Sequence, residues 1–241
     1  MKKKKLLWVI IPIAFIVSLL SAFFIYAEVY YKADETAIAA MESDESVAVS
    51  KTDYGWLFDG PSEEALIFYP GAKVEAKAYA PLLHGLAKQG LDVCLVEMPF
   101  RFAFFGINRA SKAMESHQYA TWYIGGHSLG GAIASEYASA HSDKLSGIIV
   151  FASFPSKAID ENLFEISIYG SNDQVLNRDK VESGKSYAPS RFYEYVIEGG
   201  NHAQFGNYGS QNGDGAATIS AEEQQGKAID FILDCLAIEN Q

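Results

Sequence analysis

The sequence predicts an α/β domain, with helices on both faces of a mostly parallel central sheet, preceded by one transmembrane helix. Three observations support this fold class. Short apolar runs typical of buried strands alternate with helical patterns along the chain. A Gly-x-Ser-x-Gly turn stands between an apolar run and an alanine-rich helical pattern. An uncharged apolar run follows a cluster of lysines near the start, and 241 residues suffice for one domain plus this appendage.

The transmembrane helix is expected within residues 1–27. Four lysines at positions 2–5 precede the apolar run 6–26, which is long enough to cross a bilayer. The lysines predict a cytoplasmic N-terminus, with the rest of the chain outside the cell membrane. A secreted protein released by signal cleavage near Ala27 is the alternative. We favour an uncleaved signal anchor, because Tyr26 stands where a cleavage site usually has a small residue.

Residues 28–50 are polar and rich in alanine, which predicts a stalk or a first helix before a catalytic domain at 51–241. The runs 47–49 and 54–58 look like antiparallel strands that open the sheet, and Asp59-Gly60 is typical of a hairpin turn between them and the next segment of the chain.

The remaining elements alternate between strand and helix. Buried strands are expected at 64–69, 91–96, 121–124, 145–151, 164–169 and 191–197. Helices are expected at 79–88, 107–117, 132–141 and 219–236.

Composition excludes several classes of partner. The net charge is −11, and no basic stripe exists beyond residues 2–5, which argues against nucleic acid. Cys94 and Cys235 lack the spacing of a metal site, so we expect two buried free thiols rather than a disulfide. Asp214 is a single acid among glycines, with too few neighbouring ligands for calcium, and we expect no metal.

Ser128 is the candidate nucleophile, because it stands at the apex of the turn Gly126-His127-Ser128-Leu129-Gly130. A turn from strand to helix forces its apex residue into strained backbone geometry, and a Cβ at Gly126 or Gly130 would collide with a neighbouring strand or helix. The apex also lies at a helix N-terminus, where backbone N–H groups can stabilise an oxyanion. The rival interpretation is a purely structural glycine turn.

From residue 64 to the C-terminus the sequence resembles the α/β-hydrolase fold, and within it the small single-domain serine hydrolases without a large lid. The resemblance rests on the serine turn, a glycine turn after the strand 64–69, an aspartate after the strand 164–169 and a histidine after the last strand. Only about ten residues follow Ser153 where larger lipases insert a cap, which implies an open site. Dienelactone hydrolases, a similar lidless branch, often carry Cys as nucleophile, and Ser128 argues modestly against their substrates.

The resemblance implies that Asp173 and His202 complete a catalytic triad with Ser128, in the family's chain order of nucleophile, acid and base. A capping aspartate is the rival interpretation of Asp173, and Asp160 and Asp179 are weaker candidates for the acid.

Glycines before His202 would let its imidazole swing over the serine. The other histidines, His84, His117, His127 and His141, are better explained as structural or surface residues.

The resemblance also implies an oxyanion hole made by the backbone N–H groups of Leu129 and Ala72. Here Pro70 replaces the histidine that often precedes the glycine of the second turn, and an ordinary turn between strand and helix is the alternative.

Four aromatic residues, Phe100, Phe102, Phe104 and Phe105, follow the strand 91–96. Loops at the carboxyl ends of parallel strands line the ligand crevice, so these rings are candidates for an apolar substrate-binding wall. Simple packing and contact with the nearby membrane are the alternatives.

Taken together, the sequence favours a membrane-anchored serine hydrolase that cleaves a small carboxylic ester, or a related acyl bond, without a cofactor. Two alternatives stay open: a catalytically silent binding or scaffold protein on this fold, and an acyltransferase in which an alcohol replaces water. The sequence determines neither the physiological substrate nor the oligomeric state.

Overall fold

The computed structural model describes residues 2–241, which divide into two compact units, 2–30 and 31–241. The first unit consists mainly of the helix α1 (Lys2–Glu28). Within its stretch Ile10–Glu28, an 18-residue window has a mean hydropathy of 2.4. The length and composition of this stretch therefore suit a membrane span. A signal sequence near the N-terminus would meet the same test.

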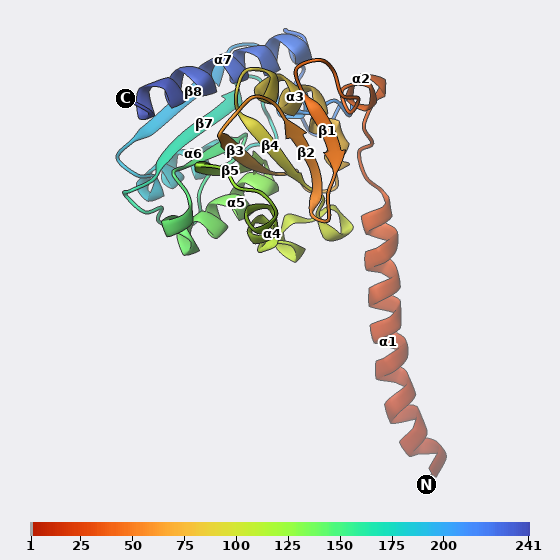
Figure 1. Ribbon diagram of the computed structural model, residues 1–241. Coiled ribbons are helices and arrows are strands. Elements are labelled where there is room, and N and C mark those ends of the chain that lie inside the picture. The colour runs from red at the N-terminus through yellow and green to blue at the C-terminus, as the bar shows by residue number, and fades with distance from the viewer. Residues whose placement is uncertain (1) are drawn as a thin grey trace. The chain divides into compact units, whose positions relative to one another are not determined.

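The second unit contains one eight-stranded sheet with the strand order β1-β2-β4-β3-β5-β6-β7-β8 (Figure 1). β1 and β2 are antiparallel, β2 pairs antiparallel with β4, and the other neighbours are parallel. The strands are β1 (Ala48–Lys51), β2 (Gly55–Asp59), β3 (Glu64–Tyr69), β4 (Asp92–Val96), β5 (Thr121–His127), β6 (Gly147–Phe151), β7 (Phe164–Gly170) and β8 (Phe192–Ile197).

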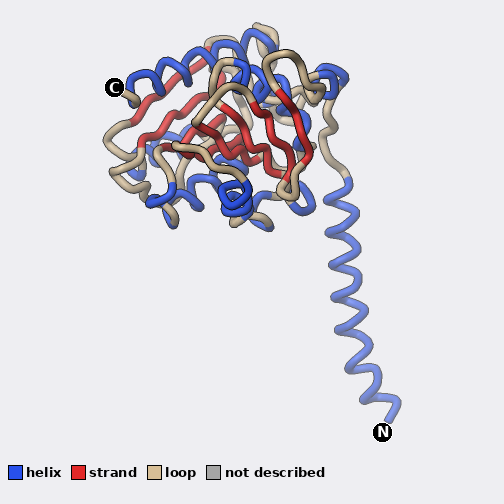
Figure 2. The backbone as a smooth tube through the Cα atoms, in the orientation of Figure 1, coloured by secondary structure: helices blue, strands red, loops and turns tan. Residues whose placement is uncertain are grey.

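Helices cover both faces of this sheet, which confirms the predicted fold class (Figure 2). The α-helices of the second unit are α2 (Glu35–Ala39), α3 (Ala80–Lys88), α4 (Arg109–Ser116), α5 (Leu129–Ala140), α6 (Arg178–Gly184) and α7 (Ala221–Glu239). Short 3₁₀ segments are η1 (Ala76–Tyr79), η2 (Pro99–Arg101), η3 (Ala103–Phe105), η4 (Ser142–Lys144), η5 (Lys185–Tyr187) and η6 (Ala203–Phe205).

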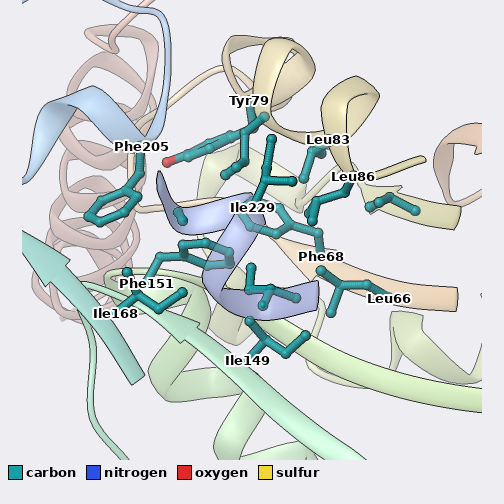
Figure 3. Packing of buried hydrophobic residues seen from close by; sticks show 14 of the residues in the cluster. Leu66, Phe68, Tyr79, Leu83, Leu86, Ile149, Phe151, Ile168, Phe205 and Ile229 are labelled. Atoms are coloured by element: carbon teal, nitrogen blue, oxygen red, sulfur yellow. The ribbon is translucent and has the colours of Figure 1, made fainter. Parts of the chain in front are cut away.

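Side-chain alternation along the buried strands produces two cores. Leu66 and Phe68 of β3 pack with α3 and α7 on one face, where Figure 3 shows Leu83, Leu86 and Ile229. Ile67, between them in sequence, belongs to the core on the other face, under α4 and α5. Both cysteines are buried and free, as expected. The 154–163 connection between β6 and β7 carries no cap domain.

The segment expected as a stalk belongs largely to the second unit. From Tyr31 onward the chain packs with the sheet domain, because Tyr31 pairs in parallel with Val74 and donates its N–H to the Lys73 carbonyl (2.8 Å). Asp34 caps α2, and this helix has only five residues. Within residues 28–50 the structure thus has backbone pairing at Tyr31 and one short capped helix.

Asp59-Gly60 does not form the expected hairpin, because β2 and β3 are not neighbours in the sheet. β4 lies between them, and Gly60 N–H is held by the Asp92 carboxylate at 2.8 Å. The turn instead begins the connection that leads from β2, on one side of β4, to β3 on the other side.

Glu165 is an ionisable group inside the sheet. It lies in β7 and is 1% exposed, and its Oε2 atom has no hydrogen-bond partner among the described residues. Burial raises the pKa of Glu165 from 4.5 to about 8, because the charged form would lose its hydration.

We therefore expect stability to fall as the pH rises from about 4.5 to 8, since the folded protein must keep a proton that the unfolded chain has released. Glu165→Gln removes this cost, and it should raise the free energy of unfolding by on the order of 2–4 kcal/mol near pH 9 and by much less near pH 4.5. Chemical unfolding of the full chain at both pH values measures the difference. Glu222→Gln, on the exposed side of α7, controls for the lost charge, and equal gains in the two variants would contradict the prediction.

Candidate active site

Ser128 occupies the sharp turn between β5 and α5. Its backbone has φ 53° and ψ −124°, a conformation that costs an L-residue energy. Two bonds hold it there. Its N–H donates to the Phe151 carbonyl (2.9 Å), and its own carbonyl accepts from the Ser153 hydroxyl (2.8 Å). The side chain is thereby presented at the start of α5 from a fixed backbone.

The two glycines of the turn are required by close packing, as expected. A Cβ on Gly126 would lie 2.3 Å from the Tyr69 carbonyl oxygen at the end of β3. A Cβ on Gly130 would lie 2.1 Å from the same oxygen and 2.4 Å from the Pro70 carbonyl oxygen. Only glycine allows the strand end and the first turn of α5 to approach so closely.

Asp173 and His202 are brought together from the ends of β7 and β8. His202 Nδ1 donates to Asp173 Oδ2 at 2.8 Å, and both side chains are buried. The other carboxylate oxygen of Asp173 accepts the N–H groups of Val175 (2.9 Å) and Leu176 (2.8 Å). Asp173 therefore caps the turn at Val175 and Leu176, as the rival interpretation expected, and it also binds His202.

A pocket of about 270 Å³ collects Ser128, Leu129 and His202 in one place. His202 Nε2, on the side of the ring away from Asp173, is buried and has no hydrogen-bond partner among the described residues. A neutral imidazole held through Nδ1–H leaves this atom as a proton acceptor. The other lining residues are Ala132, Ala152, Ser153, Phe154, Val175, Leu176, Asn177 and Lys180.

Asp214 ties together the two loops that carry Asp173 and His202. Its Oδ2 accepts the N–H of Ala203, the residue after His202, at 2.9 Å. Its Oδ1 accepts the N–H of Gln174, the residue after Asp173, at 3.3 Å. Backbone donors occupy both oxygens, so Asp214 is a brace between the loops. Sequence reasoning considered it only as a metal ligand and missed this role.

A second pair of polar contacts holds the loop after His202 to α7. Gln224 accepts the N–H of Asn201 through Oε1 (2.9 Å) and donates to its carbonyl through Nε2 (2.8 Å). Asn201 in turn donates to the Gly215 carbonyl (2.8 Å). Buried amides that satisfy both backbone groups of one residue fix its position.

Ala72 lies in the turn after β3, which packs against the serine turn through the Tyr69 and Pro70 carbonyls. It is not among the residues lining the pocket beside Ser128. The preceding N–H, that of Gly71, donates to the Tyr79 hydroxyl (3.0 Å). The N–H group of Gly71 is therefore already used in a structural hydrogen bond to Tyr79.

His127, the variable residue of the turn, is structural. Its Nδ1 lies 2.9 Å from the Tyr79 hydroxyl, which links it to the Gly71 turn. Its ring centroid lies 4.5 Å from that of His202. Burial, and then the proximity of His202, hold the pKa of His127 well below 6.5, so its ring stays neutral beside the candidate base.

The remaining histidines lie away from this pocket. His84 Nε2 meets Asp44 (3.2 Å), and His117 Nε2 meets the Tyr54 hydroxyl (2.9 Å). His141 stacks on Tyr137.

The weaker acid candidates are also placed elsewhere. Asp160 accepts from Ser142 and Asn162 at the surface, and Asp179 lies in the first turn of α6. The part of the chain that the structure describes holds no group of three or more His, Cys, Asp or Glu residues suited to a metal ion.

The four phenylalanines lie on η2, η3 and the residue between them, and none lines the pocket beside Ser128. Phe102 is buried, whereas Phe100, Phe104 and Phe105 are exposed. The aromatic wall expected from the sequence is thus separate from this pocket, whose lining residues follow β5, β6, β7 and β8.

Comparison with family models matches residues 65–226 to the alpha/beta hydrolase family. Among solved structures, Est1E from Butyrivibrio proteoclasticus has a TM-score of 0.56 and 12% identity, over 80% of this chain and 100% of that one. The carboxylesterase CesB from Bacillus subtilis has a TM-score of 0.55 and 10% identity, over 89% and 98% of the two chains.

A structure described as a membrane phospholipase A and bacterial virulence factor has a TM-score of 0.58 and 10% identity, over 97% of this chain and 99% of that one. Identities this low establish a shared fold alone. Comparison with curated proteins found no match.

Asp214→Asn tests the brace. The carboxylate of Asp214 accepts hydrogen bonds from two backbone N–H groups, whereas an asparagine side chain has one oxygen and one NH₂ group. The NH₂ group would face one of these N–H donors, so the loops that carry Asp173 and His202 should shift. We expect the reaction of Ser128 with a fluorophosphonate to slow about tenfold or more, because small displacements of reacting groups cost that much. Asp234→Asn, on the exposed side of α7, should leave the labelling rate unchanged. Similar rates for both variants would show that the brace does not position the site.

Proposed function

This chain belongs to the alpha/beta hydrolase family, and we propose that it is a membrane-anchored serine hydrolase that cleaves a small carboxylic ester through an acyl-enzyme. Ser128 is the nucleophile, His202 the general base and Asp173 the acid that orients His202. The observation that carries the proposal is the buried 2.8 Å bond between His202 and Asp173, with Nε2 of the same ring unpartnered in a pocket shared with Ser128.

In the proposed reaction, Ser128 Oγ attacks the ester carbonyl while His202 Nε2 takes its proton. The resulting imidazolium is stabilised by Asp173, which stays ionised and holds Nδ1–H. The N–H groups of Leu129 and Ala72 are proposed to bind the oxyanion. His202 then protonates the departing alcohol, and a water activated by the same ring releases the acyl group.

The size and walls of the pocket favour a modest acyl group. Its volume is about 270 Å³, at the small end of ligand sites, and its apolar side includes Leu129, Val175 and Leu176. With no cap domain between β6 and β7, the site is open to solvent on the side away from the sheet. Both features support a short acyl chain and tolerate a larger alcohol portion outside the pocket.

Labelling with a fluorophosphonate probe tests the nucleophile. The full chain in detergent micelles should react covalently, because an activated serine attacks the phosphorus of the probe and displaces fluoride from it. Ser128→Ala should abolish the labelling, whereas Ser116→Ala, which removes an exposed hydroxyl on α4 outside the pocket, should retain it. Absence of labelling in the folded wild-type protein would contradict the proposal and favour a silent binding protein.

The membrane topology is proposed from the lysines at 2–5 and the apolar helix α1. Both native cysteines are buried, so Ile238→Cys at an exposed site of α7 would supply one reactive thiol. A membrane-impermeant maleimide should label this variant on intact cells but not the wild-type protein. Labelling that appears only after the cells are permeabilised would place the catalytic domain inside.

A further inference from the structure

A cluster of exposed aromatic rings lies on residues 99–105, here called the phenylalanine loop. Phe100, Phe104 and Phe105 are 41%, 48% and 48% exposed, and contiguous exposed apolar residues, unlike scattered ones, mark interaction sites. The ring centroids of Phe104 and Phe105 are 4.5 Å apart, and those of Phe100 and Phe105 are 5.6 Å apart. The three rings therefore form one contiguous apolar surface.

The segment that carries these rings has a charge opposite in sign to that of the whole chain. Residues 99–112 contain Arg101, Arg109 and Lys112 and no aspartate or glutamate, although the chain carries a net charge of −11. Aromatic rings interleaved with cations match the chemistry of a bilayer surface, where rings enter the headgroup region and cations meet anionic lipid.

Backbone contacts tie the phenylalanine loop to the point where the chain enters the sheet domain. Tyr31 exchanges hydrogen bonds with Lys73 O (2.8 Å) and Glu75 N (2.9 Å). Lys73 N–H in turn donates to the Arg101 carbonyl (2.9 Å). α1 ends at Glu28, only three residues before Tyr31, and three residues span at most about 11 Å. The covalent tether between the end of α1 and Tyr31 is therefore short.

The loop is also held in one conformation. Lys73, Phe100 and Arg101 have φ values of 58°, 53° and 62°, which residues with a Cβ adopt only where the surrounding structure imposes them. A fixed loop presents its rings at no further cost in conformational entropy.

From these contacts we propose that the phenylalanine loop docks the sheet domain onto the surface of the bilayer in which α1 is anchored. The occupant of this surface is the lipid headgroup region, with Phe100, Phe104 and Phe105 inserted and Arg101, Arg109 and Lys112 facing anionic headgroups. The docking adds an interaction surface to the proposed function and does not require catalysis.

Docking through this loop orients the catalytic pocket. η3 packs against α5, the helix that begins directly after Ser128, and the loop and Ser128 both follow carboxyl ends of strands in one sheet. The edge of the sheet that carries the pocket then faces the bilayer.

Depth-dependent quenching tests the docking. Full-length Phe104→Cys, labelled with a nitrobenzoxadiazole fluorophore, is reconstituted in nanodiscs of phosphatidylcholine and phosphatidylglycerol containing a doxyl-labelled lipid. Ile238→Cys is the matched control, since it is also an exposed apolar residue but lies on α7, on the opposite face of the sheet (Figure 1). The native cysteines are buried and do not compete for the label.

We expect the probe at position 104 to be quenched at least about twofold more than the probe at 238, since inserted side chains lie several ångströms into the headgroup region. Equal quenching at the two positions, in variants whose thermal unfolding matches the wild type, would overturn the proposal. Neither outcome depends on hydrolysis, so a protein without esterase activity is distinguished from one that does not dock.

Discussion

Backbone atoms at the end of β3 and in the turn after β5 approach so closely that a Cβ at Gly126 or Gly130 would lie 2.1–2.3 Å from the Tyr69 carbonyl oxygen. This packing holds Ser128 at its positive φ directly before α5, and it brings the end of β3 and Pro70 against the turn that contains the serine. The strain is maintained by the large buried core on both faces of the sheet. The sheet therefore supplies the energy that keeps one side chain in an unfavourable conformation.

The fold class could be predicted because its signals are local. Apolar runs of five to seven residues separated by helical patterns indicate a parallel sheet, and the glycines around Ser128 have a steric reason that a single motif reveals. Asp173 and His202 could be named because each directly follows a strand, and parallel strands end at the same edge. The sequence order of the strands and the family pattern were enough for both.

Contacts between distant segments are the part that the sequence could not predict. Asp59-Gly60 has the chemistry of a hairpin, but only the insertion of β4 between β2 and β3 decides that the chain must cross instead. Tyr31 forms a parallel β-bridge with Val74, which lies 43 positions further along the chain. No periodicity within residues 28–50 predicts this pairing. Asp214 looks like a loop acid, and its bonds to Gln174 and Ala203 appear only once two loops have met.

The groups around the pocket reach it from segments far apart along the chain: the serine turn comes from the middle, whereas His202 and Asp214 come after β8. The turn at Ser128 needs β3, β5 and β6, all of which precede residue 152. During synthesis, the part of the chain that forms the nucleophile is therefore complete well before the part that carries the base. A chain that stops short of β8 contains Ser128 but lacks His202, the imidazole proposed to activate it. The candidate base is thus added with the last fifth of the polypeptide, long after the apolar N-terminal segment has been synthesised.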